Sequence, residues 1–584
     1  MHTRVALVAW TILIGLGAAS AAGQSAATQP AAPPATRPTV PAAVEHALQV
    51  VPDDTHLLVV VPDIADLARG VRAFCMAAGL PAADEVSAAG LLGDLLEEVG
   101  RAVDPAGPLV LAVSAERPEP VMIVLLKDAE ALGATGAPTR VRGAEVYELK
   151  REQLAAVTAE RIAVFARERA DVEAALGSTG KAVRKLTPEH MALLARRQVL
   201  LWVEVAPWQA TIQRGLSFAL QMVSLGAAAE GPDGEWTIQF YRAVFDLLGK
   251  VLRETEHYAA AVQIDAQGVF FEDRATFRAD GAADRLLADV RPARGDLLRG
   301  LPAGALMTFG AEWDTAPGAA SLNEAVLRAM LSSNPWRERL EAGKVEQLIE
   351  RSGKLYQTMT GFNGALLPAE GGGMLYAGLH FTTDAEAVLR EVRAVVRESP
   401  ELLKVWSALP SAEITYETET VDGTSLDCYL FNFGVEDPQL QPMLSAFYGN
   451  DASVYFLAAP QGAVYAMGPR AQARSLALRM RNSPPAAHAD DARYTTLLKR
   501  LSPRPYFCLT MDLPGTMQLF FKSIEKAGMP LPPLDFGSQP TPLAGVAFYL
   551  ERPAVRFELF VPAEAVGALA KGFGALGPEA REAF

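Results

Sequence analysis

Acidic and histidine side chains, which are residue types that ligate metal ions, come close together at three points of the sequence. The three groups are Asp53, Asp54 and His56; Glu254, Glu256 and His257; and His488, Asp490 and Asp491. Each group could offer two or three ligands to one ion. Local structure accounts for each more simply, as a turn after a proline, the end of a polar helix and a solvated loop. We therefore predict no metal site and no cofactor.

A glycine-rich segment, Gly177–Lys181, resembles part of a phosphate-binding loop. A complete loop needs a further glycine where Ala175 stands and a magnesium-binding hydroxyl where Ala182 stands. The segment therefore predicts a plain turn and no bound nucleotide.

Two serine–lysine pairs, Ser178 with Lys181 and Ser523 with Lys526, have the spacing used by penicillin-recognising enzymes. In those enzymes the serine begins a buried helix, so that the lysine one turn later can take its proton. Ser178 lies in the glycine-rich turn and Ser523 lies late in a helix headed by Pro514, so neither pair is predicted to be catalytic. Gly-X-Ser-X-Gly, His-Glu-X-X-His, EF-hand and Cys-X-X-Cys motifs do not occur. A glycosidase-like pair of carboxylates stays open, because the separation of distant residues cannot be read from sequence.

Aromatic side chains offer another kind of binding surface. Six of the seven tryptophans lie in the two halves of the chain that follow the spacer: Trp202, Trp208, Trp236, Trp313, Trp336 and Trp406. Trp208 falls on the apolar stripe of a predicted helix and is expected in the core, whereas the others stay open as stacking platforms. A helical pattern of Met517, Phe520, Phe521 and Ile524 is interpreted as helix core in preference to a lipid groove.

Composition excludes some partners. The chain has 68 acidic and 53 basic residues and a net charge of −15, whereas nucleic acid binding needs clustered lysine and arginine. The same charge argues against docking on anionic lipid. Three cysteines (Cys75, Cys428 and Cys508) are too few for a disulfide scaffold. A bond between Cys428 and Cys508 stays open, with buried thiols as the alternative.

The first residues have the pattern of an export signal. A polar start precedes the apolar run Val5–Ala19, and Ala19–Ala21 supplies the small residues of a cleavage site. We predict a signal peptide over residues 1–22, with an uncleaved membrane anchor as the alternative. Residues 23–43 are rich in alanine, proline and threonine and are predicted to be a disordered spacer. No later stretch has the length and hydropathy of a membrane span, so the mature chain is expected outside the cytoplasm, in the periplasm or secreted.

The second half of the chain repeats the order of elements in the first. Val51–Val61 and Leu301–Phe309 both begin with a proline turn and continue as an apolar strand, and Asp128–Ala131 has the same four residues as Asp384–Ala387. Further matches in the same order are Gly143–Tyr147 with Gly423–Tyr429, Ile162–Leu176 with Ala463–Leu478, and Leu200–Pro207 with Phe507–Pro514.

These matches predict an α+β fold of two tandem, duplicated modules, residues 44–294 and 295–584. Because hairpins and helices alternate without a βαβ rhythm, each module should have a largely antiparallel sheet with helices packed on a face. Two unrelated α+β domains are the alternative.

The segments that begin with a proline turn carry a further signal. Val51–Phe74, Leu301–Val326 and Pro505–Phe521 repeat blocks of proline, strand, aspartate and helix. Together with the signal peptide and the spacer, this layout resembles an uncharacterised family of exported bacterial proteins with duplicated modules. The resemblance implies the architecture over most of the mature chain, and it implies no activity and no site residues.

These observations predict an exported, non-enzymatic binding or scaffold protein of the bacterial cell envelope, with an envelope protein or a ligand as its partner. Two alternatives stay open. One is an extracytoplasmic hydrolase with its site between the modules, recognisable by buried carboxylates or a histidine–acid pair. The other is a carrier of a hydrophobic ligand, which requires a large apolar cavity.

Overall fold

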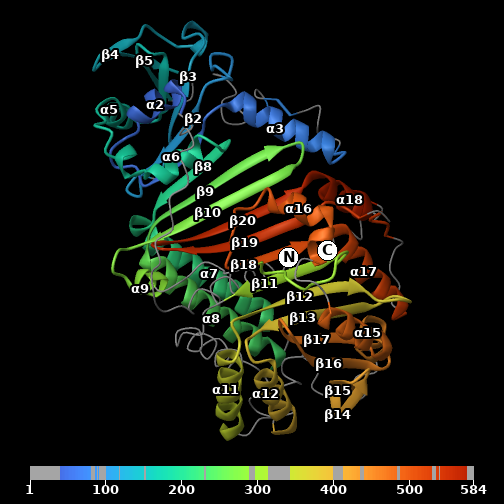
Figure 1. Cartoon of the computed structure of the whole chain (residues 1–584). Helices are drawn as coiled ribbons and strands as arrows, with labels where there is room; N and C mark the ends of the chain where they lie inside the picture. Colours follow the sequence, from blue (N-terminus) through green and yellow to red (C-terminus); the bar gives the residue numbers. More distant parts are fainter. Residues whose placement is uncertain are drawn as a thin grey trace.

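The structure is a computed structural model (Figure 1). It describes residues 40–80, 86–87, 90, 100–117, 119–149, 153–228, 232–288, 296–312, 342–398, 412–433, 440–482, 487–528, 534–537 and 540–574. The predicted signal peptide, residues 23–39 of the spacer, and Trp313, Trp336 and Trp406 lie outside the described residues. The first described helix starts at Ala42, within the range predicted to be the spacer.

Each half of the chain contributes ten described strands. Those of the first half are β1 (Leu57–Val61), β2 (Leu109–Val113), β3 (Val121–Leu125), β4 (Thr139–Val141), β5 (Ala144–Glu148), β6 (Leu154–Val157), β7 (Ile162–Ala166), β8 (Val199–Glu204), β9 (Thr255–Asp265) and β10 (Gly268–Phe277). Those of the second half are β11 (Met307–Glu312), β12 (Gly361–Pro368), β13 (Met374–Phe381), β14 (Ala412–Val421), β15 (Thr424–Phe433), β16 (Ala452–Ala459), β17 (Gly462–Pro469), β18 (Phe507–Met511), β19 (Ala544–Glu551) and β20 (Ala554–Pro562).

All twenty strands belong to one antiparallel sheet. The two halves of the chain join where β10 pairs with β20, and we call this pairing the seam. From one edge of the sheet to the seam the order is β4-β5-β6-β7-β3-β2-β1-β8-β9-β10. From the seam to the other edge it is β20-β19-β18-β11-β12-β13-β17-β16-β15-β14. The α+β class and the antiparallel pairing predicted from sequence are therefore confirmed. The expectation of a separate sheet in each half is wrong, because β10 and β20 pair with each other and remove the two edges that separate sheets would expose.

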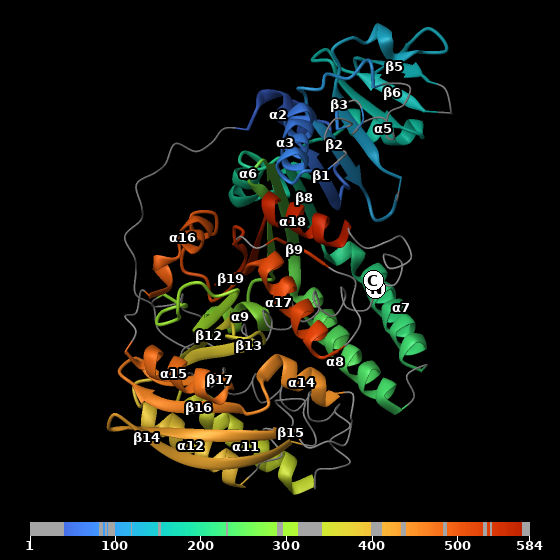
Figure 2. The same ribbon diagram turned by 90° about the vertical axis from the view of Figure 1, so that its right-hand side faces the viewer.

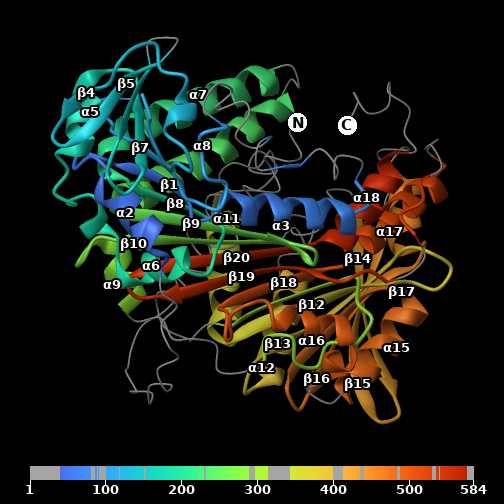
Figure 3. The same ribbon diagram turned by 90° about the horizontal axis from the view of Figure 1, so that it is seen from above.

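Figure 3 shows this seam, with β8, β9, β10, β20, β19 and β18 side by side through the middle of the molecule. The first half of the chain lies at one end and the second half at the other. The β9–β10 hairpin turns at Asp265–Gly268.

Helices cover the sheet. They are α2 (Ala42–Gln49), α3 (Ile64–Ala77), α5 (Arg169–Leu176), α6 (Pro188–Leu194), α7 (Gln209–Ala228), α8 (Pro232–Glu254), α9 (Ala282–Ala288), α11 (Ala342–Gln357), α12 (Ala385–Glu398), α14 (Leu440–Tyr448), α15 (Arg470–Arg481), α16 (Ala492–Leu498), α17 (Leu513–Lys526) and α18 (Ala563–Gly574). Among the described helices, none is both long and apolar enough to cross a membrane. Figure 2 shows α7 and α8 as a hairpin of two long helices that extends from one side of the sheet.

Two helices matter for the site because their C-terminal ends lead to the seam. In the first half, α6 packs Leu193 and Leu194 into a core that contains Leu200 and Trp202 of β8. In the second half, α16 packs Leu497 into a core that includes residues of β10 and β20. Both helices therefore cover the same face of the sheet. Helix α6 lies over the strands of the first half and α16 over those of the second half.

Candidate binding site

Asp53 holds the glycine-rich segment from within the protein. Its carboxylate accepts hydrogen bonds from the backbone N–H groups of Thr179 (3.1 Å) and Lys181 (2.9 Å) and from the Thr179 hydroxyl (2.7 Å). The hydroxyl bond is the main cause that lowers the pKa of Asp53 below its ordinary value. The loop that resembles a phosphate site therefore binds an internal carboxylate, and Asp53 serves as its anchor.

Asp54 and His56 have other partners. Asp54 pairs with Arg117, which also binds Asp171 of α5. His56 accepts a hydrogen bond from the Ala115 N–H at 3.2 Å through Nδ1. The three residues of this group therefore each bind a different partner within the protein.

The second sequence group is also divided. Glu254 accepts a hydrogen bond from the Ala282 N–H at 2.9 Å, whereas His257 lies 3.5 Å from Glu256. The ring of His257 also lies 5.5 Å from that of Trp202. Glu254 therefore holds the start of α9, and only the other two residues of the group meet.

The third group separates as well. His488 is buried and contacts Asp296 at 2.7 Å, whereas Asp491 caps α16 and binds Arg493. Asp490 is exposed. Among the described residues, no three histidine, cysteine or acidic side chains converge on one point.

Neither serine–lysine pair is brought together by its hydrogen bonds. Ser178 donates to the Val51 carbonyl at 2.6 Å, and the buried Ser523 donates to the Leu519 carbonyl at 3.0 Å. Lys526 donates instead to the Gly371 carbonyl at 3.1 Å. Both serine hydroxyls are therefore used in hydrogen bonds to backbone carbonyl groups.

Of the aromatic candidates, Trp202 is 1 % exposed and belongs to the core, and Trp208 is half-buried. The side chain of Trp236 lies outside the described residues. On α17, Phe521 is buried, but Phe520 is 43 % exposed with its ring 5.5 Å from that of Phe447. The predicted helix core is therefore correct for Phe521 and wrong for Phe520, which lies at its margin.

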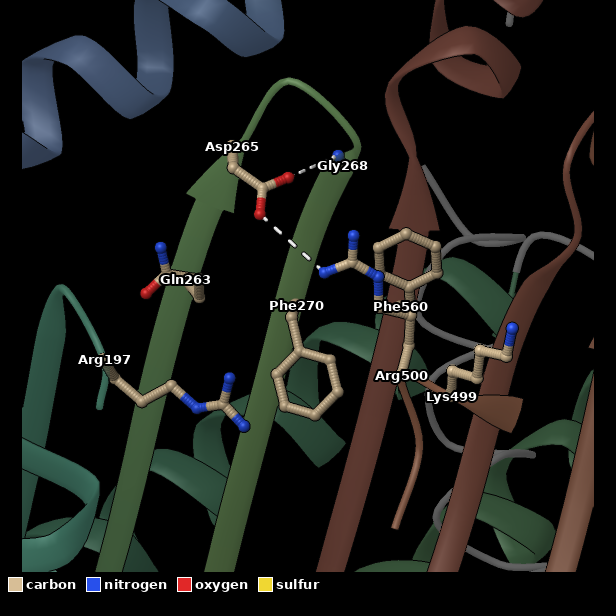
Figure 4. Close-up of a pocket in the computed structure, with 8 residues that line it drawn as sticks. All are labelled: Arg197, Gln263, Asp265, Gly268, Phe270, Lys499, Arg500 and Phe560. Atoms are coloured by element: carbon tan, nitrogen blue, oxygen red, sulfur yellow. Dashed lines mark hydrogen bonds and ion pairs between the residues drawn. The ribbon is translucent and has the colours of Figure 1, made fainter. Parts of the chain in front are cut away.

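A pocket of about 230 Å³ opens at the seam, and Figure 4 shows its lining. We call it the seam pocket; its lining residues are Arg197, Gln263, Asp265, Gly268, Phe270, Lys499, Arg500 and Phe560. Half of them come from β9, β10 and the turn between these strands, and three come from the second half of the chain.

Local structure explains how the cations reach this pocket. Thr187 and His190 cap α6 reciprocally, since the Thr187 hydroxyl accepts from the His190 N–H and His190 Nδ1 accepts from the Thr187 N–H at 3.1 Å. The helix ends at Leu194, so Arg197 stands in the short connection to β8. In the second half, Lys499 and Arg500 follow the end of α16 in the same way.

Arg197 forms one wall of the seam pocket. Its guanidinium carbon lies 4.1 Å from the centre of the Phe270 ring, and one terminal nitrogen donates to Glu272 at 2.9 Å. Its Nε is buried and has no hydrogen-bond partner among the described residues. A buried N–H without an acceptor is costly, so the contacts that Arg197 makes among the described residues do not satisfy all of its donors.

Arg500 forms the opposite wall. Its guanidinium carbon lies 5.7 Å from the centre of the Phe560 ring, and a terminal nitrogen lies 3.9 Å from Asp265. That carboxylate also accepts hydrogen bonds from the N–H groups of Gln267 and Gly268 in the β9–β10 turn. Lys499 is exposed at the rim. The lining thus has three cations against one acid, in a chain whose net charge is −15.

Sequence reasoning missed this site. The sequence feature that could have pointed to it is a similar segment in each half of the chain. Leu193–Arg197 has the sequence Leu-Leu-Ala-Arg-Arg, and Leu497–Arg500 has the sequence Leu-Leu-Lys-Arg. Each basic pair follows one helix, and the two segments meet only because β10 pairs with β20. Comparisons with family models, with curated proteins and with solved structures found no match for this chain.

Proposed function

We propose that the chain is an exported, non-enzymatic binding protein that holds a small anion in the seam pocket. The observation that carries the proposal is the unpartnered, buried Nε of Arg197 in a pocket lined by three cations. Cations grouped around a partly enclosed space attract an anion more strongly than the same cations dispersed on a surface.

Export is part of this proposal. The predicted signal peptide (residues 1–22) and spacer (residues 23–43) direct modules 44–294 and 295–584 out of the cytoplasm, to the periplasm or the medium. A binding protein of the cell envelope would meet small anions there.

We also infer that the two halves arose by duplication. Renumbered within its own half, each set of ten strands has the order 4-5-6-7-3-2-1-8-9-10. Equivalent hairpins turn with left-handed backbone at equivalent residues, Arg142 and Gly143 in one half and Asp422 and Gly423 in the other. In this account the seam pocket lies where the copies meet, as in many proteins with sites between domains.

The hydrolase alternative has weaker support. The buried His488–Asp296 pair is the kind of pair that it needs, but the pocket beside His488 has about 10 Å³ of space. Such a space holds roughly one water molecule and no substrate. Neither pocket described here is the large apolar cavity that a carrier of hydrophobic ligands requires.

The test is unfolding by urea at constant ionic strength, with chloride replaced stepwise by acetate, benzoate or sulfate. An anion that binds the folded state raises the unfolding midpoint as its concentration passes the dissociation constant. The double variant Lys499→Gln/Arg500→Gln should lose most of that increase. Arg196→Gln is the matched control, because Arg196 is exposed beside Arg197 and does not line the pocket. Equal increases in the double variant and the control would contradict the proposal.

A further inference from the structure

We propose that the ligand of the seam pocket is a small carboxylic acid with an aromatic or branched apolar body. This inference rests on the proposed function and names the ligand class for the same site. The carboxylate lies between Arg197 and Arg500, and the apolar body lies on Phe270 and Phe560.

The floor of the pocket is apolar. Phe270 of β10 and Phe560 of β20 are paired directly opposite each other across the seam, and they are 7 % and 8 % exposed. The Cβ atoms of residues opposite each other in an antiparallel pair stand about 5 Å apart, so the two side chains leave the sheet next to each other on the same face. Figure 4 shows the Phe270 ring beside the guanidinium group of Arg197 and the Phe560 ring beside that of Arg500. A ligand without an apolar part would leave this surface in contact with water.

The walls select an acid. One terminal nitrogen of Arg197 donates to Glu272, and the buried Nε–H has no acceptor among the described residues. Among the described residues, the ion pair that Arg500 makes is a long one of 3.9 Å to Asp265, so its guanidinium has donors to spare. A carboxylate oxygen can accept from each of two guanidinium groups, and such charge-assisted bonds are about twice as strong as neutral ones.

The volume sets the size of the acid. About 230 Å³ is the space of roughly seven water molecules in the liquid. Benzoate or a short branched fatty acid has a body of that size, whereas a nucleotide or a long-chain fatty acid does not fit.

The equivalent place at the other end of the seam, on the same face of the sheet, is closed. The β10–β20 pairing is symmetric about the opposed pair Glu272 and Glu558, so the place that corresponds to Phe270 and Phe560 is occupied by Arg274 and Arg556. Both of these arginines bind Glu551, at 3.5 and 2.9 Å. Ion pairs therefore fill the second position, and the phenyl floor is present once.

The experiment is calorimetric titration of the full chain with sodium benzoate, acetate or sulfate at one ionic strength. We expect benzoate to bind with a stoichiometry of one and at least tenfold more tightly than acetate or sulfate. Phe560→Leu should weaken benzoate several-fold and leave acetate unchanged, because it replaces the ring and keeps the site apolar. Lys499→Gln/Arg500→Gln should weaken every anion.

Phe520→Leu is the matched control, because that ring lies on α17 and outside the seam pocket. If acetate or sulfate binds as tightly as benzoate, or if Phe560→Leu binds benzoate as tightly as the wild type does, the proposed ligand class is wrong and the anion site stands. If none of the three anions binds, the proposed function itself fails. If Phe560→Leu does not unfold cooperatively, Phe270→Leu takes its place, and the same outcomes apply to it.

Discussion

Glu272 and Glu558 lie directly opposite each other across the seam, and each is the fifth residue of its strand. Both are buried, with 6 % and 1 % of their surface exposed. Like charges opposite each other in a sheet repel, so the pair requires compensation. Arg197 binds Glu272 at 2.9 Å, whereas Glu558 accepts from the Ser502 N–H at 2.8 Å, from the Tyr549 hydroxyl at 2.9 Å and from Arg556. The joint between the halves is therefore a neutralised polar layer next to the phenyl floor of the pocket.

Loss of one of these carboxylates should be costly. Glu558→Ala removes one of the two carboxylates that pair with the buried Arg556 and removes an acceptor from Ser502 and Tyr549. We expect the free energy of unfolding to fall by about 3–5 kcal/mol, measured by urea denaturation. The same substitution at the exposed Glu564 of α18 should change it by less than about 0.5 kcal/mol. Similar values for the two variants would contradict the role of this polar layer.

The Asp53 anchor makes a separate prediction. Asp53→Ala removes the acceptor of the exposed N–H groups of Thr179 and Lys181, which water can then hydrate, so we expect a loss of about 0.5–1.5 kcal/mol in unfolding free energy. Because the Thr179 hydroxyl contacts the same carboxylate, Asp53→Ala and Thr179→Val should cost less together than the sum of their separate effects. Additive losses would show that the two side chains do not interact.

The interior histidine that caps α6 should make stability depend on pH. Burial lowers the pKa of His190 from 6.5 to about 4, with smaller effects from His257 and Arg274. As pH falls from 6.5 to 4, the unfolded chain takes up a proton that the folded chain does not, so stability is lost over that range. His190→Gln removes this titration and keeps an acceptor for the Thr187 N–H.

The unfolding free energy of His190→Gln should therefore fall less steeply between pH 6.5 and 4, by up to about 1.4 kcal/mol per pH unit. Urea denaturation at several pH values measures this slope. Parallel pH profiles for wild type and variant would contradict the buried, neutral imidazole.

The cysteines give a direct chemical test. Cys75, Cys428 and Cys508 are unpaired and buried, so the open question of a Cys428–Cys508 bond is answered by free thiols. Burial also raises the pKa of Cys508 to about 12, which suppresses its reactive thiolate. A thiol reagent should find no reactive cysteine in the native protein and three after denaturation in guanidinium. One thiol after denaturation would reveal a disulfide.

Sequence patterns predicted the local elements well because their causes are local. Asp63 caps α3 through the Asp66 N–H, and the β9–β10 turn forms at Asp265–Gly268. The continuous sheet was not predicted, because no residue near β10 in the sequence indicates that this strand pairs with β20 instead of facing solvent. The pocket was missed for the same reason: Arg197 and Arg500 are about three hundred positions apart and look like ordinary surface charges. Phe270 and Phe560 look like ordinary strand residues, and only the register of the seam makes them one floor.

The most direct test of the account is diffraction from crystals of the protein soaked in a bromine-substituted benzoate, with data collected at the bromine absorption edge. The account predicts one anomalous bromine peak per chain, over the rings of Phe270 and Phe560, with the carboxylate within hydrogen-bond distance of the guanidinium groups of Arg197 and Arg500. A peak elsewhere on the chain, or an empty seam pocket at a concentration that saturates binding in solution, would contradict the central claim.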